Sequence, residues 1–324
     1  MSAKPKVIIT RKIPAACEAE AQQRFDAVIN RDDVPLSTEQ LKEALRDADG
    51  LLPTVTDKVT ADVLATSPLR ARIIANFGVG FNNIDIEAAR RLGLTVTNTP
   101  DVLTDDTADI AMTLLLMIGR RAGEGERHVR NREWTGWRPT HMLGAKVSGK
   151  TLGLIGFGRI AKAVARRAHH GFGMRIIFSD PFPPKPEEAK ALGAEQRGTA
   201  EEVLREADFI SLHCPATPET RHLINAERLK LMRKDAFLIN TARGDVVDEA
   251  ALIAALKSKT IAGAGLDVFE KEPAVGPELL SMENVVLLPH LGSATLETRV
   301  AMGMRAIENL TLFFNGQPVR DRVV

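Results

Sequence analysis

The stretch from residue 151 to residue 161 constrains the fold of this chain more than any other. A short apolar run opens directly into residues 156–161, Gly-Phe-Gly-Arg-Ile-Ala, and a helical pattern follows. Gly156 permits a tight turn out of a strand, Gly158 lets the backbone approach a pyrophosphate, and the small Ala161 lets helix and strand pack closely. Because the N–H groups that open the helix face phosphate charge, the spacing predicts a dinucleotide-binding turn.

An acidic residue follows the next apolar run, residues 174–178, at the tip of the expected second strand. Asp180 lies there, 24 residues after Gly156. A carboxylate at this place can accept hydrogen bonds from both hydroxyls of an adenosine ribose, and it repels a 2′-phosphate. The position therefore favours NAD over NADP. The alternative is that Asp180 is a turn residue or a helix N-cap before Pro181.

Composition narrows the class of protein. The 324 residues are 44% hydrophobic and 26% charged, with a formal net charge of +1, which argues against a broad nucleic-acid-binding surface. No apolar run approaches the roughly 20 residues of a membrane span. The two cysteines, Cys17 and Cys214, indicate neither a disulfide framework nor a metal site. A strand-like run starts at residue 7, too early for a signal peptide, so we expect a cytoplasmic protein without a membrane or nucleic-acid partner.

Strand-like and helical patterns alternate along two parts of the chain. Up to about residue 100 there are five strand-like runs, and from residue 151 onward there are six more, the number expected of a doubly wound dinucleotide domain. No glycine follows the opening strand of the first part, so the second part is the cofactor domain. We expect the final helix, residues 294–314, to pack on the first domain. The fold class is therefore α/β, with two doubly wound, Rossmann-like parallel sheets.

Three other segments allow more than one interpretation. Residues 76–85 follow a strand and precede a helix, so they form either an anion-binding nest or a plain turn. The apolar helix over residues 107–118 is expected at a domain interface or a subunit contact. Trp134 and Trp137 lie in a polar segment, where they either mark a contact or cap a small local core.

Three polar residues follow successive strands of the cofactor domain. They are Arg243, Glu272 and His290. Active residues of open α/β sheets collect at the carboxyl ends of the strands. A guanidinium can bind a carboxylate through two hydrogen bonds, and an imidazolium can protonate a carbonyl oxygen as hydride reaches its carbon. A neighbouring carboxylate favours the charged form of the histidine, so the three residue types suit the reduction of a 2-oxo acid.

Each of these residues also has a structural interpretation. A histidine is more often structural than catalytic, Glu272 before Pro273 can be a turn residue, and Arg243 can cap a helix. Three matching roles at successive strand ends, downstream of a cofactor turn, favour the catalytic interpretation.

Four motifs make the chain resemble the D-2-hydroxyacid dehydrogenase family over nearly its whole length. They are residues 156–161, 240–247, 265–273 and 288–294. The resemblance implies that Arg243 binds substrate and supports catalysis, that Glu272 is the partner acid, and that His290 is the proton donor.

The resemblance also implies binding residues. Backbone N–H groups of a loop in the first domain would hold the substrate carboxylate, and other positions would surround the nicotinamide, the phosphates and the adenine. The substrate-binding residues would be Val79, Gly80, Arg243 and Trp137. Those at the nicotinamide would be Thr241, Asp267 and Gly292, that near the phosphates Thr107, and those at the adenine Cys214 and Pro215. The remaining cofactor-binding residues would be Gly156, Phe157, Gly158, Arg159, Ile160 and Asp180.

The family layout is discontinuous. A catalytic, substrate-binding domain would comprise residues 1–100 and 293–324, and an NAD-binding Rossmann domain would comprise residues 101–292. The resemblance places the active site in a cleft between the two domains, which closes to exclude water, and implies a homodimer formed through the cofactor domains.

Residues 134–139 are similar to the glyoxylate/hydroxypyruvate reductase branch of the family. There the residue matching Trp137 reaches the neighbouring subunit's substrate pocket, and so bulky a wall favours small substrates. Asp180 departs from NADPH-preferring relatives, which carry a neutral or basic residue at this position. We therefore expect NADH-dependent reduction of glyoxylate to glycolate and of hydroxypyruvate to D-glycerate. The alternatives are a dehydrogenase for a larger 2-oxo acid such as phenylpyruvate and, in a different class, an NAD-binding scaffold or corepressor.

Overall fold

The chain folds into two compact units. A computed structural model describes residues 3–324. Unit 1 comprises Met1–Leu103 together with Ala294–Val324, and unit 2 comprises Thr104–Ser293.

The sheet of unit 1 is entirely parallel. Within residues 3–324 it has five strands in the order β2-β1-β3-β4-β5. The strands are β1 (Lys6–Ile9), β2 (Asp26–Ile29), β3 (Gly50–Leu52), β4 (Ile73–Ala75) and β5 (Thr95–Thr97). They are short and apolar, as is usual for parallel strands that are covered on both faces.

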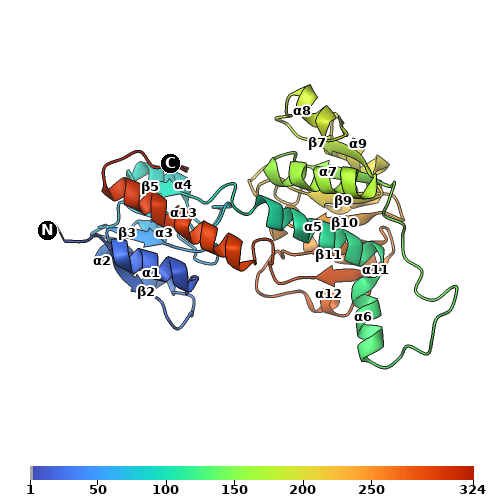
Figure 1. The fold of residues 1–324 in the computed structure, drawn as a ribbon, viewed down its shortest axis with the longest axis horizontal. Helices are drawn as coiled ribbons and strands as arrows, with labels where there is room; N and C mark the ends of the chain where they lie inside the picture. Colours follow the sequence, from blue (N-terminus) through green and yellow to red (C-terminus); the bar gives the residue numbers. More distant parts are fainter. Residues whose placement is uncertain (1–2) are drawn as a thin grey trace. The chain divides into compact units, whose positions relative to one another are not determined.

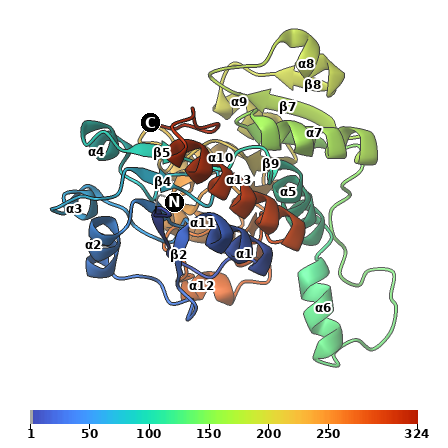
Figure 2. The same ribbon diagram turned by 60° about the vertical axis from the view of Figure 1, so that its left-hand side comes forward.

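Helices cover both faces of this sheet. Leu51, Ile74 and Val96 pack with three helices on one face, and two helices that contact each other lie on the other. The first group is α2 (Thr38–Asp47), α3 (Ala61–Leu64) and α4 (Ile86–Arg91), and the second is α1 (Ala15–Arg24) and α13 (Leu296–Phe314). Figure 2 shows α13 lying beside α1. The prediction that the final helix returns to the first domain is confirmed.

Side-chain caps begin several of the helices of unit 1. Ser37 and Gln40 form a reciprocal capping box at the start of α2, and Asp85 caps α4 through the N–H of Ala88. These contacts satisfy backbone donors that have no partner inside the helix.

The sheet of unit 2 has one strand more than the sequence predicted. Within residues 3–324 it has seven parallel strands in the order β12-β11-β10-β9-β6-β7-β8. They are β6 (Thr151–Ile155), β7 (Arg175–Ser179), β8 (Ala194–Gln196), β9 (Phe209–Leu212), β10 (Phe237–Asn240), β11 (Gly263–Leu266) and β12 (Val285–Leu287). The prediction of six strands was wrong because it missed β8, an edge strand in which Glu195 and Gln196 are exposed and no apolar pattern marks it.

Two layers of helices cover the sheet of unit 2 (Figure 1). The layers are α5 (Thr104–Gly119) with α7 (Arg159–Phe172) on one face, and α9 (Ala200–Glu206), α10 (Ala226–Leu231) and α11 (Glu249–Lys257) on the other. Shorter or peripheral elements are α6 (Ala122–Arg130), α8 (Pro186–Ala191), α12 (Pro277–Leu280) and the 3₁₀ helix η1 (Gly244–Val246).

The apolar helix α5 is buried by its own unit. It contacts α7, β10 and β11, and its buried residues, including Leu114 and Leu115, belong to the core on that face of the sheet. Its apolar character therefore needs no domain or subunit interface to explain it.

A helix that the sequence did not predict, α6, has no buried residues. Figure 2 shows it and the loop after it extending away from the sheet of unit 2. Trp134 and Trp137, in that loop, are 55% and 82% exposed, so the alternative that they cap a local core is wrong for the single chain. Within residues 3–324, no helix combines the length and the apolar character needed to cross a bilayer.

Candidate active site

The turn after β6 requires glycine at its first position. Gly156 has a φ of +85°, a conformation that other residues rarely adopt, and a Cβ atom there would lie 2.7 Å from the backbone N of Cys214. The chain thus leaves β6 in direct backbone contact with the segment that follows β9. This geometry agrees with the tight turn predicted for Gly156, and it brings Cys214 beside the turn.

The start of α7 has free space beside Gly158 and is closely packed at Ala161. Gly158 is the N-cap of α7, and a Cβ atom on it would meet no other atom of residues 3–324 within 4 Å. Ala161, one turn into the helix, is completely buried. The first N–H groups of a helix have no partner within it, and here they lie next to the open side of Gly158, at the positive end of α7. This arrangement fits a phosphate group.

The structure gives Asp180 a role in shaping the backbone. Its Oδ2 accepts a hydrogen bond from the N–H of Phe157 at 2.6 Å, and its Oδ1 accepts one from the N–H of Phe182 at 2.7 Å. The turn interpretation of Asp180 is therefore correct as far as Phe182 is concerned. The contact with Phe157 also places the carboxylate directly at the glycine turn, where it can still accept further hydrogen bonds through its remaining lone pairs.

Arg243 lies in the loop after β10, which Asn240 shapes. The Asn240 side chain donates to the carbonyl of Arg243 at 2.8 Å and accepts from the N–H of Ala242 at 3.0 Å. Next in the chain, Gly244 packs against the loop after β11, because a Cβ atom on it would lie 1.9 Å from the carbonyl carbon of Phe269. Sequence reasoning missed both Asn240 and Gly244 as positioning residues. The sequence feature that could have identified Asn240 is a polar residue at the end of an otherwise apolar strand.

Glu272 and His290 form a pair. Nδ1 of His290 lies 2.8 Å from Oε2 of Glu272, and the other oxygen, Oε1, accepts from the N–H of Phe269 at 3.1 Å. An ionised carboxylate can only accept, so Nδ1 carries the proton of this bond. Nε2 of His290 has no hydrogen-bond partner within residues 3–324, and the side chain is 33% exposed. Nε2 is therefore the nitrogen that can face a substrate.

Asp267 holds the loop that carries His290. Its Oδ1 accepts from the N–H of Leu291 at 2.6 Å and its Oδ2 from the N–H of Gly292 at 2.8 Å, while its carbonyl accepts from the N–H of His290 at 2.9 Å. His290 itself has a φ of +57°, which is uncommon for a residue with a side chain. Such a conformation persists only where surrounding contacts impose it, and Asp267 supplies them.

The charges of the site affect one another. Burial lowers the pKa of the Arg243 guanidinium, while the charges of Glu272 and Asp245 oppose that shift. Burial alone would raise the pKa of Glu272, but its hydrogen bond and charge interaction with His290, its bond from Phe269 and the charge of Arg243 together lower it. Glu272 therefore stays ionised near neutral pH, where it stabilises an imidazolium at His290.

Two buried threonines, Thr107 and Thr241, belong to this part of unit 2. The Thr107 hydroxyl donates to the carbonyl of Gly292 at 2.8 Å, so Thr107 lies beside the residues predicted around the nicotinamide. Thr241 is buried, and its hydroxyl has no hydrogen-bond partner within residues 3–324. A buried hydroxyl without a partner is costly, and a bound polar group would satisfy it.

In unit 1, asparagines hold the carbonyl groups of the predicted substrate loop. The Asn76 side chain donates to the carbonyls of Gly78 and Gly80 at 3.3 and 2.9 Å, and that of Asn98 donates to the carbonyl of Val79 at 2.8 Å. The N–H groups of Val79 and Gly80 form none of the backbone hydrogen bonds of residues 3–324. This geometry favours the anion-nest interpretation over the plain turn. Sequence reasoning missed Asn76 and Asn98.

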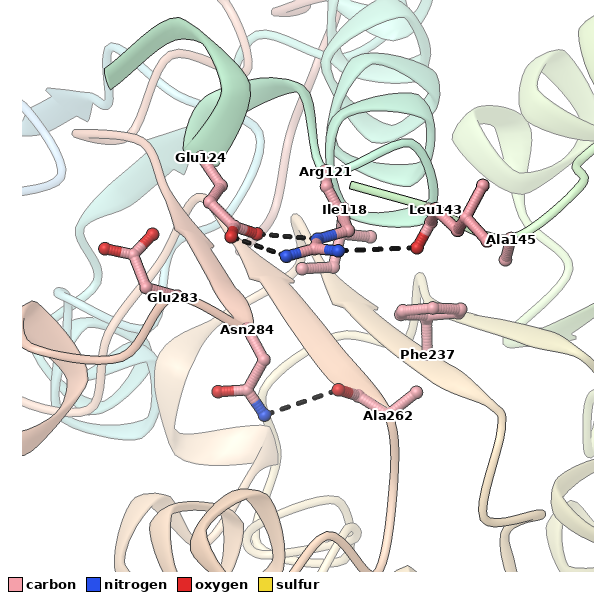
Figure 3. Close-up of a pocket in the computed structure, with 11 residues that line it drawn as sticks. Ile118, Arg121, Glu124, Leu143, Ala145, Phe237, Ala262, Glu283 and Asn284 are labelled. Atoms are coloured by element: carbon pink, nitrogen blue, oxygen red, sulfur yellow. Dashed lines mark hydrogen bonds and ion pairs between the residues drawn. The ribbon is translucent and has the colours of Figure 1, made fainter. Parts of the chain in front are cut away.

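A cavity of about 320 Å³ lies elsewhere in unit 2 (Figure 3). Phe237, Ala262 and Asn284 place it at the amino-terminal ends of β10, β11 and β12. Its charged residues are paired, since Arg121 donates to both oxygens of Glu124 at 2.7 and 2.6 Å. Ligands of open α/β sheets bind at the opposite, carboxyl ends, so we do not assign this cavity to the substrate.

Within residues 3–324 no group of three or more His, Cys, Asp or Glu side chains is arranged to hold a metal ion. Trp137 lies in the loop after α6, where its side chain is 82% exposed.

Comparisons with known proteins identify the family of this chain. Residues 112–292 match the model of the D-isomer specific 2-hydroxyacid dehydrogenase NAD-binding domain. A glyoxylate reductase of Thermococcus onnurineus (strain NA1) is 48% identical over 318 residues, which cover 97% of this chain and 94% of that protein.

Two solved structures are also similar. An NADPH-dependent glyoxylate/hydroxypyruvate reductase of Sinorhizobium meliloti, in complex with NADP and malonate, is 35% identical with a TM-score of 0.89, covering 99% of this chain and 97% of that one. A holo D-mandelate dehydrogenase of Rhodotorula graminis is 30% identical with a TM-score of 0.87, covering 99% and 98%. These similarities are consistent with the glycine turn and with the Arg, Glu and His that follow the strands. They show that the chain belongs to the D-isomer specific 2-hydroxyacid dehydrogenase family, an NAD-dependent class of oxidoreductases.

Proposed function

We propose that this enzyme uses NADH to reduce glyoxylate to glycolate and hydroxypyruvate to D-glycerate. The observation that carries the proposal is the 2.8 Å pair of His290 and Glu272, in the same unit as Arg243 and the glycine turn after β6. The relatives named glyoxylate reductase support the small substrate.

In the proposed reaction each side chain handles one charge. The Arg243 guanidinium binds the carboxylate of the 2-oxo acid through two parallel hydrogen bonds. Nε2 of His290 donates its proton to the carbonyl oxygen as hydride reaches the carbonyl carbon, so that a C–H and an O–H bond form and the C=O π bond is lost. Glu272 stabilises the imidazolium before the transfer, and the imidazole then regains a proton from water.

The residues present fit a nicotinamide dinucleotide. The groups that would hold it are the N–H groups at the start of α7 beside the open side of Gly158, the Asp180 carboxylate and the Thr241 hydroxyl, which has no partner within residues 3–324. When bound, the reduced nicotinamide supplies the hydride. We assign Gly156 and Ala161 to shaping the turn, and Asp267, Gly292 and Thr107 to supporting the His290 loop beside the nicotinamide.

Replacing Asp180 with asparagine is expected to reduce the preference for NADH. The kcat/KM ratio of NADH to NADPH should fall by about 10- to 100-fold, because a hydrogen bond to a charged group is lost and a 2′-phosphate is no longer repelled. Initial rates with each cofactor at saturating glyoxylate measure the ratio. An unchanged ratio would place cofactor specificity elsewhere. Thermal unfolding should be followed in parallel, because the amide cannot accept from both Phe157 and Phe182.

Substrate size and assembly are linked in the proposal. Trp137 is 82% exposed in the single chain, and a large exposed aromatic side chain is typical of a protein contact. We propose that the enzyme is a homodimer in which Trp137 reaches the partner's substrate pocket and limits its size. Carboxylate binding by Val79 and Gly80, and a cytoplasmic location, remain predictions.

A panel of initial rates tests the proposed function. Glyoxylate, hydroxypyruvate, pyruvate and phenylpyruvate are each assayed with NADH and NADPH by absorbance of the reduced nicotinamide. Fast turnover of the first two with NADH is the expected result. Preference for phenylpyruvate would keep the family but overturn the substrate proposal, and the similarity to a D-mandelate dehydrogenase makes this comparison necessary. Tight NADH binding without turnover would favour an NAD-binding scaffold.

A further inference from the structure

A second histidine–glutamate pair lies beside the active site and takes no part in the chemistry described above. Nε2 of His222 is 3.2 Å from Oε1 of Glu270. Both side chains are partly buried, with 34% and 24% of their surfaces exposed. His222 comes from the segment between β9 and α10, and Glu270 lies two residues before Glu272.

The backbone of His222 is fixed to the loop that carries Arg243. Its N–H donates to the carbonyl of Asp245 at 2.8 Å, and two residues later the N–H of Ile224 donates to the carbonyl of Val246 at 3.0 Å. His222 has a φ of +49°, an uncommon conformation for a residue with a side chain. These contacts direct the imidazole towards Glu270.

Glu270 is held from a second side as well. Its N–H donates to Oε2 of Glu249, in the first turn of α11, at 3.3 Å. Glu249 thus places a second carboxylate near Glu270, whereas Asp245 contacts His222 through its neutral backbone carbonyl. An imidazole that donates to Glu270 makes a charge-assisted hydrogen bond there.

The pair joins the two loops that must stay aligned for catalysis. Asp245 lies two residues after Arg243, and Glu270 lies two residues before Glu272. Between them Gly244 packs directly against the Phe269 carbonyl, so the loops meet backbone to backbone. A shift of one loop would move the other, or separate Arg243 from Glu272.

We propose that His222 and Glu270 are positioning residues, which hold the Arg243 loop and the Glu272 loop in register for the reduction. This inference rests on the proposed function. It predicts that loss of the pair weakens both carboxylate binding and proton donation. Cofactor binding should be largely kept, because the glycine turn after β6, the start of α7 and Asp180, which would hold most of the dinucleotide, lie outside these two loops.

The test compares E270A and H222N with E270Q. In H222N the new asparagine tolerates positive φ but is too short to reach Glu270, whereas in E270Q the new glutamine keeps an oxygen that accepts from Nε2. We expect E270A and H222N to lower kcat/KM for glyoxylate by about 10- to 100-fold, through both KM and kcat, since misplacement of catalytic groups by about 1 Å has effects of this order. E270Q should recover most of the activity.

Two further readouts separate positioning from a general loss of structure. The Kd for NADH, from fluorescence quenching, should stay within about twofold in all variants. The double variant H222N/E270A should be no worse than either single variant, since the two residues act as one pair.

The control is E206A. Glu206 is a similarly exposed glutamate, paired with Arg175 and Arg197, at the amino-terminal edge of the same sheet. It should leave kcat and KM for glyoxylate unchanged. Wild-type kinetics in E270A and H222N, or an equal loss in E206A, would overturn the inference alone. No turnover by the wild-type enzyme with any 2-oxo acid would overturn the proposed function and the inference with it.

Discussion

Replacing His290 with alanine is expected to lower kcat for glyoxylate reduction by about 10²- to 10⁴-fold, the usual contribution of a positioned general acid. The physical reason is that the structure offers one imidazole nitrogen, Nε2, for donation, because Nδ1 is committed to Glu272 at 2.8 Å. Without the imidazole, water has to protonate the carbonyl oxygen. Single-turnover rates, with the enzyme–NADH complex in excess over glyoxylate, measure the effect on the chemical step.

The affinity for NADH serves as the internal control for this variant. The glycine turn and Asp180 do not depend on the His290 side chain, so the Kd of NADH should change by less than about twofold. H290N provides a second control, since asparagine also tolerates the positive φ of this position and removes strain as an explanation. Turnover close to that of the wild type in H290A would remove His290 from the role of proton donor.

The second large effect is expected at Arg243. Truncation to alanine should lower kcat/KM for glyoxylate by roughly 30- to 5,000-fold, which corresponds to the about 2–5 kcal/mol lost when one partner of a desolvated charge pair is removed. KM should rise strongly, because the substrate carboxylate loses its bidentate partner. kcat should fall as well, since the charge of Arg243 contributes to the low pKa of Glu272.

A lysine at position 243 distinguishes charge from geometry. R243K keeps the positive charge but cannot form two parallel hydrogen bonds, so it should recover only part of the loss. R233K is the matched control, because Arg233 also forms a two-bond pair, with Asp235, but lies before the start of β10 rather than after its end. If R243K matched the wild-type enzyme in KM, bidentate binding by Arg243 would be excluded.

Features encoded over a few adjacent residues were predictable from the sequence. The glycine turn is one example, because the positive φ of Gly156 and the open front of Gly158 are properties of backbone and side-chain size. The buried strands are another, because parallel strands covered on both faces are short and apolar throughout. Arg243, Glu272 and His290 were identified because each follows such a strand within a few residues and because the motifs around them resemble those of the family.

Features that depend on neighbours in space were missed or only half described. The edge strand β8 has no apolar pattern, because it is defined by pairing with β7 rather than by burial. Helix α6 buries nothing, so no periodicity predicts it. The sequence predicts that Asp180 contacts the ribose, whereas the structure shows that its carboxylate accepts hydrogen bonds from Phe157 and Phe182.

The sequence by itself therefore determined the two parallel-sheet units, the cofactor turn and the identity of the three candidate catalytic residues. Only the tertiary structure decided how the loops of those residues are held. The Asn240 side chain hydrogen-bonds the backbone of the Arg243 loop, and the Asp267 side chain hydrogen-bonds that of the His290 loop. His222 hydrogen-bonds Glu270, in the loop that carries Glu272. The physical reason is that a strand or a turn arises from neighbouring residues in the chain. A hydrogen bond between loops 25 or 48 positions apart depends on where the whole sheet places their ends.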